Sequence, residues 1–164
     1  MRASLGTAAL AALVTLIAAL PAGAAPRAGD TAAAFSLKST TGNTVTLSSL
    51  HGKPVYLNFF ASWCAPCNEE APSVVSLYQK YAPKGLVTLG VDEQEDVSKA
   101  KGFAAKYKIP FAVVLDDGPM GKGYGAIALP VHVFIDRSGK ISTYRLGEMS
   151  PSEIEDAIKK ITAR

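Results

Sequence analysis

Cys64 and Cys67 are the two cysteines of this 164-residue chain, and they lie in the stretch SWCAPC. A disulfide between them would close a ring of about four residues, which restricts the unfolded chain by only roughly 2 kcal/mol. A structural zinc site needs four ligands, whereas the chain adds only His51 and His132, far apart in sequence. The spacing therefore favours a dithiol that is oxidised and reduced in turn. A copper site built from the thiols and one imidazole stays open as an alternative.

The elements around the pair assign different roles to the two sulfurs. A buried-strand pattern, YLNFFA, runs directly into the cysteines, and helical periodicity begins at about Ala65. Cys64 is therefore expected at a helix N-terminus, where free N–H groups and the helix dipole lower the pKa of a thiol. Cys67, one turn later, is expected beneath it and more buried. Cys64 is the predicted attacking sulfur and Cys67 the resolving one, and Pro66 suits a first turn that does not need its N–H.

The rest of the chain alternates strand and helix patterns. A hairpin is predicted over residues 35–47, buried strands at 54–61, 86–92 and 110–117, a hairpin-linked strand pair at 131–136 and 141–147, and helices at about 65–82, 95–109 and 150–164. The glycine-rich segment 118–130 is expected to hold only a short helix. This order predicts an α/β fold with a mixed central sheet flanked by helices and an N-terminal β-hairpin.

The first residues differ in composition from the rest. Residues 1–24 are apolar or small, with Arg2 as their one charge and Pro21 near their end. This pattern predicts a secretory signal peptide cleaved after Ala24, with an uncleaved membrane anchor as the alternative. Residues 25–34 are predicted to be a linker or extended arm, and residues 35–164 the folded domain. Whether this segment is a cleaved signal peptide or a membrane anchor, the domain is expected to be exported.

Several segments resemble one known family. NFFASWCAPCNEEAP at residues 58–72 looks like the active-site segment of the thioredoxin superfamily, and specifically of its exported TlpA/ResA-like thiol-disulfide oxidoreductases. Residues 35–64 are similar to that subfamily's N-terminal hairpin and first core strand, and ALPVHVFIDRSGKI at 128–141 to its cis-proline strand and hairpin. The related peroxiredoxins share the L-x-G-K-x-V pattern of residues 50–55, but the Pro-x-x-x-Thr-x-x-Cys motif around their reactive cysteine is absent here. The resemblance implies a thioredoxin-like fold.

The resemblance also implies a role for each matching residue. Cys64 would be the nucleophile and Cys67 the resolving thiol. Trp63 would shield the pair and, together with Pro66, form part of the substrate-docking surface. Pro130 would be a cis proline that faces the disulfide, the alternative being an ordinary trans proline at the start of a strand.

Leu129, directly before that proline, would offer backbone hydrogen bonds to an incoming substrate strand. It completes the substrate-binding set that the resemblance implies.

Some positions depart from the family pattern. Thioredoxin has a buried Asp six residues before its first cysteine, and this chain has Asn58, which cannot take up a proton. Glu70, three residues after Cys67 on the same helix face, is the candidate acid–base group, and a surface carboxylate is the alternative. Glu69 is expected to point to solvent. His132 follows the cis proline where small hydroxyl residues are common, and it could tune the thiols, bind a metal or simply be packed.

These features together predict an exported thiol-disulfide oxidoreductase that reduces disulfides of protein substrates. Ala65 and Pro66 between the cysteines resemble the reducing members, which are recharged by a membrane-bound electron donor and serve processes such as cytochrome c maturation. No cofactor beyond the redox-active disulfide is expected. Without Arg2 the chain has 16 basic and 14 acidic residues, too even for a nucleic-acid surface. The alternative functions are a copper metallochaperone and a net oxidant or isomerase. Isomerases are usually dimeric, and no dimerisation segment is seen before Phe35. We therefore expect a monomer.

Overall fold

The computed structural model of the protein describes residues 25–163, and the predicted signal peptide or anchor lies outside the described residues. In chain order the elements are β1 (Ser36–Lys38), β2 (Thr44–Thr46), the 3-10 turn η1 (Leu47–Leu50), β3 (Val55–Phe60), α1 (Ala65–Tyr81), the 3-10 turn η2 (Ala82–Lys84), β4 (Val87–Glu93), α2 (Val97–Lys106), β5 (Ala112–Asp116), α3 (Pro119–Gly123), β6 (Val131–Ile135), β7 (Ile141–Leu146) and α4 (Pro151–Thr162). The predicted alternation of strands and helices is confirmed, with α3 as the short helix of the glycine-rich segment.

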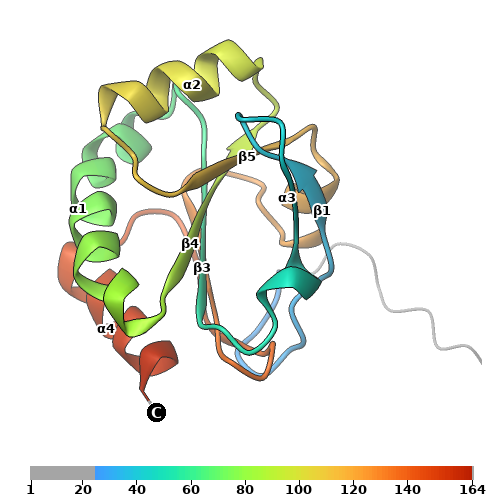
Figure 1. Cartoon of the computed structure of the whole chain (residues 1–164), viewed down its shortest axis with the longest axis vertical. Helices are drawn as coiled ribbons and strands as arrows, with labels where there is room; N and C mark the ends of the chain where they lie inside the picture. Colours follow the sequence, from blue (N-terminus) through green and yellow to red (C-terminus); the bar gives the residue numbers. More distant parts are fainter. Residues whose placement is uncertain (1–24, 164) are drawn as a thin grey trace, which may run out of the picture.

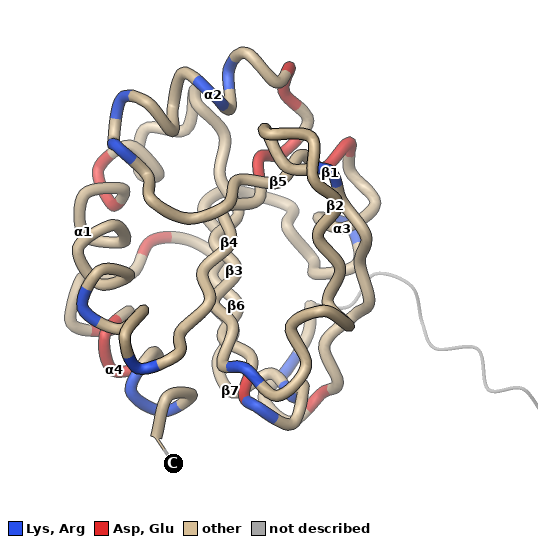
Figure 2. Tube along the Cα trace, viewed as in Figure 1, with Lys and Arg blue, Asp and Glu red and all other residues tan. Residues whose placement is uncertain are grey.

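Five strands form the central sheet in the order β5-β4-β3-β6-β7; Figure 1 gives the view, and Figure 2 labels all of these strands in it. β3, β4 and β5 run parallel, whereas β6 is antiparallel to both β3 and β7. β1 and β2 pair antiparallel in a separate two-stranded sheet. The predicted mixed α/β fold with an N-terminal hairpin is therefore confirmed.

Both faces of β3 are covered, as its continuous apolar sequence predicts. Tyr56 stacks on Phe134 in the core cluster beneath α1 and α4. Leu57 and Phe59 lie in a second cluster, on the face that the β1–β2 hairpin and α3 cover (Figure 1). β3 is thus held between two layers, and the chain that leaves it enters the cysteine segment from a fixed position.

Residues 29–32, within the predicted linker or arm, pack against the start of β7. The N–H of Gly29 donates to the Ile141 carbonyl, the N–H of Ile141 donates to the Asp30 carbonyl, and the N–H of Ala32 donates to the Gly139 carbonyl. Ala32 is only 6% exposed. The packed fold therefore reaches back to about Gly29 instead of beginning at Phe35. Small residues that pair through their backbone leave no hydrophobic periodicity in the sequence, so the hydrophobic pattern does not predict this packed segment.

Charged residues are spread over the surface. Figure 2 shows Lys and Arg on α1, α2, α4 and the turns, interspersed with Asp and Glu. Between residues 25 and 163, none of the helices has the length and apolar character needed to cross a bilayer.

Candidate active site

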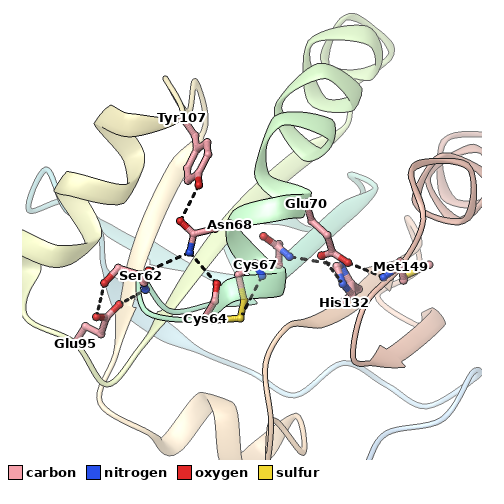
Figure 3. The surroundings of a disulfide bond; sticks show 10 residues. Ser62, Cys64, Cys67, Asn68, Glu70, Glu95, Tyr107, His132 and Met149 are labelled. Atoms are coloured by element: carbon pink, nitrogen blue, oxygen red, sulfur yellow. Dashed lines mark hydrogen bonds and ion pairs between the residues drawn. A yellow bond between two sulfur atoms is a disulfide. The ribbon is translucent and has the colours of Figure 1, made fainter.

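The two cysteines form a disulfide at the start of α1 (Figure 3). Cys64 is the N-cap residue of the helix, and its sulfur accepts a hydrogen bond from the N–H of Cys67 at 3.2 Å. The position expected from sequence for Cys64 is therefore confirmed. The expected difference in burial is wrong for this oxidised state, because Cys64 is 3% and Cys67 4% exposed. Both sulfurs share one apolar cluster with Phe60 and Phe103, and the bond holds them together there.

A hydrogen-bond network fixes the backbone on either side of Cys64 (Figure 3). Glu95, in the loop between β4 and α2, accepts from the N–H of Ser62 and from its hydroxyl at 2.7 Å. The Asn68 amide donates to the carbonyls of Ser62 at 3.0 Å and Cys64 at 2.8 Å. The Tyr107 hydroxyl donates to the Asn68 side-chain oxygen at 2.7 Å. α2 and its preceding loop thereby hold the nucleophile segment, through contacts between residues 33 to 39 positions apart that no local pattern predicts.

Leu129 and Pro130 lie at the entrance to β6. The peptide bond between them is cis, as the resemblance implies, and Pro130 is buried. Leu129 packs against the cluster that contains both cysteines. Neither its N–H nor its carbonyl makes a backbone hydrogen bond to any residue that the structure describes. The sheet thus brings an unpaired stretch of backbone to the apolar cluster that contains the disulfide.

Trp63 and Pro66 lie on the outer side of the same segment. Trp63 is 72% exposed and borders an open cavity of about 840 Å³ lined also by Leu115 and by residues of the β4–α2 loop. Pro66 is half-buried in the first turn of α1. An exposed indole beside the disulfide is available for contact with another molecule.

Glu70 points away from solvent, toward β6 and the loop after β7. Its Oε1 accepts a hydrogen bond from the N–H of Met149 at 2.6 Å, and its Oε2 lies 3.2 Å from Nε2 of His132 (Figure 3). The Glu70 side chain is 10% exposed and His132 is fully buried, whereas Glu69 is exposed as expected. Sequence reasoning singled out Glu70 and His132 separately, and the structure brings them together.

The opposite nitrogen of His132 faces β3. Its Nδ1 lies 2.7 Å from the hydroxyl of Tyr56 and 3.5 Å from the amide nitrogen of Asn58. Burial, and then the negative charge of Glu70, raise the pKa of Tyr56 well above its ordinary value, so the phenol stays protonated at neutral pH. Both ring nitrogens of His132 therefore face polar groups of the protein, Nε2 the carboxylate of Glu70 and Nδ1 the hydroxyl of Tyr56.

Two further buried carboxyl groups end β4. Burial, and then the nearby charge of Glu95, raise the pKa of Asp92 to about 7. Burial, and then the charge of Asp116, raise the pKa of Glu93 to about 8. Sequence reasoning missed both, although two consecutive acids at the end of a buried strand were a visible signal. They lie on strand β4, which pairs with β3, the strand that leads into the cysteine segment.

Comparisons with known proteins agree with this arrangement. Residues 28–144 match the model of the AhpC/TSA family. The thiol-disulfide oxidoreductase ResA of Bacillus thuringiensis is 36% identical over 135 residues, which cover 82% of this chain and 78% of the relative.

Two solved structures extend the likeness to the fold. A structure from Chlorobium tepidum, described as that of a candidate thiol:disulfide interchange protein DsbE, has a TM-score of 0.78 and 32% identity and covers 84% of this chain and 99% of its own. A secreted disulfide oxidoreductase of Mycobacterium tuberculosis has a TM-score of 0.71 and 28% identity, covering 77% and 95%. The chain therefore belongs to the AhpC/TSA family of thioredoxin-like proteins and is a thiol-disulfide oxidoreductase.

Proposed function

We propose that this oxidoreductase is exported and reduces disulfides of protein substrates, with Cys64 as the attacking sulfur and Cys67 as the resolving one. The observation that carries these roles is the hydrogen bond from the Cys67 N–H to the Cys64 sulfur at the start of α1. Such a donor, together with the helix dipole, favours the thiolate of the residue at the N-terminus.

The reaction begins from the reduced dithiol. The Cys64 thiolate attacks a substrate disulfide, forms a mixed disulfide and releases the first substrate sulfur as a thiolate. Cys67 then loses its proton and attacks the Cys64 sulfur, which forms the Cys64–Cys67 disulfide and releases the second substrate thiolate. Two electrons pass from the cysteine pair to the substrate, and solvent protonates the released thiolates. A membrane-bound electron donor would reduce the pair again.

Glu70 is the proposed acid–base group for Cys67. Its position three residues along α1 returns it to the same helix face, and its mostly buried carboxylate is held by the Met149 N–H. Asn58, which occupies the position of the thioredoxin Asp, has an amide that cannot accept the proton. A Glu70→Gln variant should therefore change the pH dependence of the cysteine reactions, and the exposed neighbour offers Glu69→Gln as a charge-matched control.

Substrate is proposed to bind as an extended strand beside the disulfide. The unpaired N–H and carbonyl of Leu129 would hydrogen-bond to its backbone, next to the cis peptide bond of Pro130. Trp63, which is largely exposed, and Pro66 would contact its side chains. These groups would select an extended protein segment over a compact surface.

The resemblance to the TlpA/ResA-like oxidoreductases supports the proposed direction of electron flow and the proposed partners. Ala65 and Pro66 between the cysteines are typical of reducing members, and the named relatives include ResA and a secreted oxidoreductase. Apocytochrome c or an accessory protein of its maturation is the proposed substrate class, and the protein is proposed to act as a monomer after removal of residues 1–24.

A trapping experiment tests the roles of the cysteines. Reduced Cys67→Ala protein mixed with oxidised insulin should accumulate a covalent complex that runs as one band without reductant and dissociates with it. The Cys64→Ala protein should give no such complex. Equal trapping by both variants would overturn the assignment. A Cu(I) titration of the reduced protein separates the copper alternative, which predicts tight stoichiometric binding that His132→Ala abolishes.

A further inference from the structure

Three polar side chains from three elements meet beneath the start of α1. Tyr56 comes from β3, Glu70 from α1 and His132 from β6, and we call them the Tyr56–His132–Glu70 cluster. Tyr56 is 1% exposed, His132 is fully buried and the Glu70 side chain is 10% exposed. Burial of three polar groups is costly unless they satisfy one another, so the arrangement needs a reason.

The donors around His132 decide which nitrogen carries the proton. The amide nitrogen of Asn58 at 3.5 Å can only donate, and the hydroxyl of Tyr56 at 2.7 Å can donate as well, so this arrangement assigns Nδ1 as the acceptor. The proton then resides on Nε2, the atom that faces Glu70. The antiparallel register places Asn58 directly opposite His132, so β3 and β6 fix this tautomer together.

Nε2 and the Glu70 Oε2 have no other polar partner among residues 25–163. They lie 3.2 Å apart in a contact that is close but not aligned as a hydrogen bond. The other carboxylate oxygen is held at 2.6 Å by the N–H of Met149. One carboxylate oxygen thus accepts a backbone hydrogen bond, and the other lies against the His132 ring (Figure 3).

Glu70 is the charged group that faces the ring. The backbone partner of His132 on β7 is Arg145, whose guanidinium instead pairs at 3.0 Å with Glu153 and is about half exposed. From β3 the ring meets the neutral amide of Asn58 and Tyr56, which is neutral because burial raises its pKa. α4 contributes apolar side chains such as Ile154 and Ile158 to the neighbouring core.

We propose that His132 is the positioning residue of Glu70, and that it sets the pH at which Glu70 can accept the proton of Cys67. This inference rests on the acid–base role proposed above for Glu70. The His132 ring is the polar group nearest to Oε2, at 3.2 Å, and its N–H dipole favours the charged carboxylate, whereas an apolar side chain would leave this buried oxygen without a polar neighbour. Without that polar neighbour the charged carboxylate would be disfavoured in its buried place, and Glu70 would take the proton of Cys67 less readily.

The test follows the two thiol steps separately. Reduced protein is mixed with 5,5′-dithiobis(2-nitrobenzoate) in a stopped-flow instrument from pH 5 to 9. Cys64 releases the first nitrothiobenzoate, and Cys67 releases the second as the protein disulfide closes. His132→Leu should leave the first phase within about twofold, slow the second roughly tenfold at pH 7 and move its pH midpoint up by about one unit. His132→Gln, which keeps an N–H donor, should recover most of the loss.

A double-mutant cycle with Glu70→Gln separates failure of this inference from failure of the function beneath it. If His132 acts through Glu70, adding His132→Leu to Glu70→Gln should change the second phase no further. The inference would be overturned if His132→Leu slowed the second phase equally in the parent protein and in Glu70→Gln. It would also be overturned if Glu70→Gln shifted the pH midpoint of the second phase and His132→Leu did not. An unchanged midpoint in Glu70→Gln itself would overturn the proposed role of Glu70.

Tyr56→Phe keeps the test decisive if His132→Leu does not fold. Phenylalanine keeps the stacking on Phe134, where the ring centroids lie 4.4 Å apart, and removes only the hydroxyl, the nearer of the two groups that face Nδ1. The midpoint of the second phase should move in the same direction as in His132→Leu, by a smaller amount. Because the Tyr56 hydroxyl is the nearer group at Nδ1, 2.7 Å away against 3.5 Å for the Asn58 amide, a Tyr56→Phe midpoint identical to that of the parent protein would contradict the inference.

Discussion

The carboxylate of Glu95 accepts hydrogen bonds from both the backbone N–H and the hydroxyl of Ser62, two residues before Cys64. The loop after β4 thereby holds the segment that leaves β3. Glu95→Gln should weaken this attachment, because an amide has one oxygen where the carboxylate has two and brings an N–H toward a donor. We expect the free energy of unfolding to fall by about 1–2 kcal/mol, measured in urea.

Asp96→Asn is the control for that variant. It removes the same charge from the next residue, which is exposed and makes no side-chain cap hydrogen bond at the start of α2. Its stability should stay within about 0.5 kcal/mol of the parent protein. Equal losses in the two variants would mean that charge, and not the Ser62 contact, is responsible.

Asp92 should make the protein less stable as the pH rises. Its pKa is about 7 in the fold against an ordinary 3.8, so below about pH 4 it is protonated in both states. Between these values the unfolded chain releases the proton while the folded protein keeps it, and unfolding becomes more favourable with rising pH. The fall in unfolding free energy from pH 4 to pH 8 should be smaller in Asp92→Asn by about 2–4 kcal/mol.

Urea unfolding of the oxidised protein at both pH values checks this prediction. Asp117→Asn, at an exposed position on the loop after β5, is the matched control and should follow the parent protein at both values. A fall of the same size in Asp92→Asn and in the parent protein would show that Asp92 titrates normally.

Trp63 should matter for large substrates and hardly for small ones. Because its side chain is largely exposed beside the disulfide, Trp63→Ala should change the unfolding free energy by less than about 0.5 kcal/mol. It should lower kcat/KM for a protein disulfide by roughly tenfold, as loss of a docking aromatic does. Turnover of a small aromatic disulfide should change by less than about twofold, and equal losses on both substrates would place Trp63 in the chemistry instead of in docking.

Features that depend on neighbouring residues could be predicted from the sequence, and those that depend on distant pairing could not. The place of Cys64 at the helix start follows from a strand and a helix that adjoin it, and the prediction is confirmed. The contact of Glu70 with His132 depends on how β6 pairs with β3, which no local pattern contains. The Glu95–Ser62 contact joins residues 33 positions apart. Family resemblance supplied the cis bond before Pro130, which composition and period alone do not reveal.

The two cysteines are equally buried, although their positions in the helix predict that Cys67 is the more buried of the two. The expected difference between Cys64 and Cys67 came from helix geometry, in which the later residue lies deeper. In the oxidised protein the disulfide bond keeps both sulfurs in one apolar cluster, so whole-residue exposure does not separate them. A covalent constraint between the side chains thus overrides what the helix position alone implies.

The reduction potential of the Cys64–Cys67 pair tests the proposed reductase most directly. The protein is equilibrated with mixtures of reduced and oxidised glutathione at pH 7, and the thiols are then alkylated and the two forms counted by mass. A reductase function predicts a potential near that of thioredoxin, about −270 mV, at which the reduced pair gives its electrons to most protein disulfides. A value near about −120 mV, that of the strong oxidant DsbA, would contradict it and make the protein a donor of disulfides.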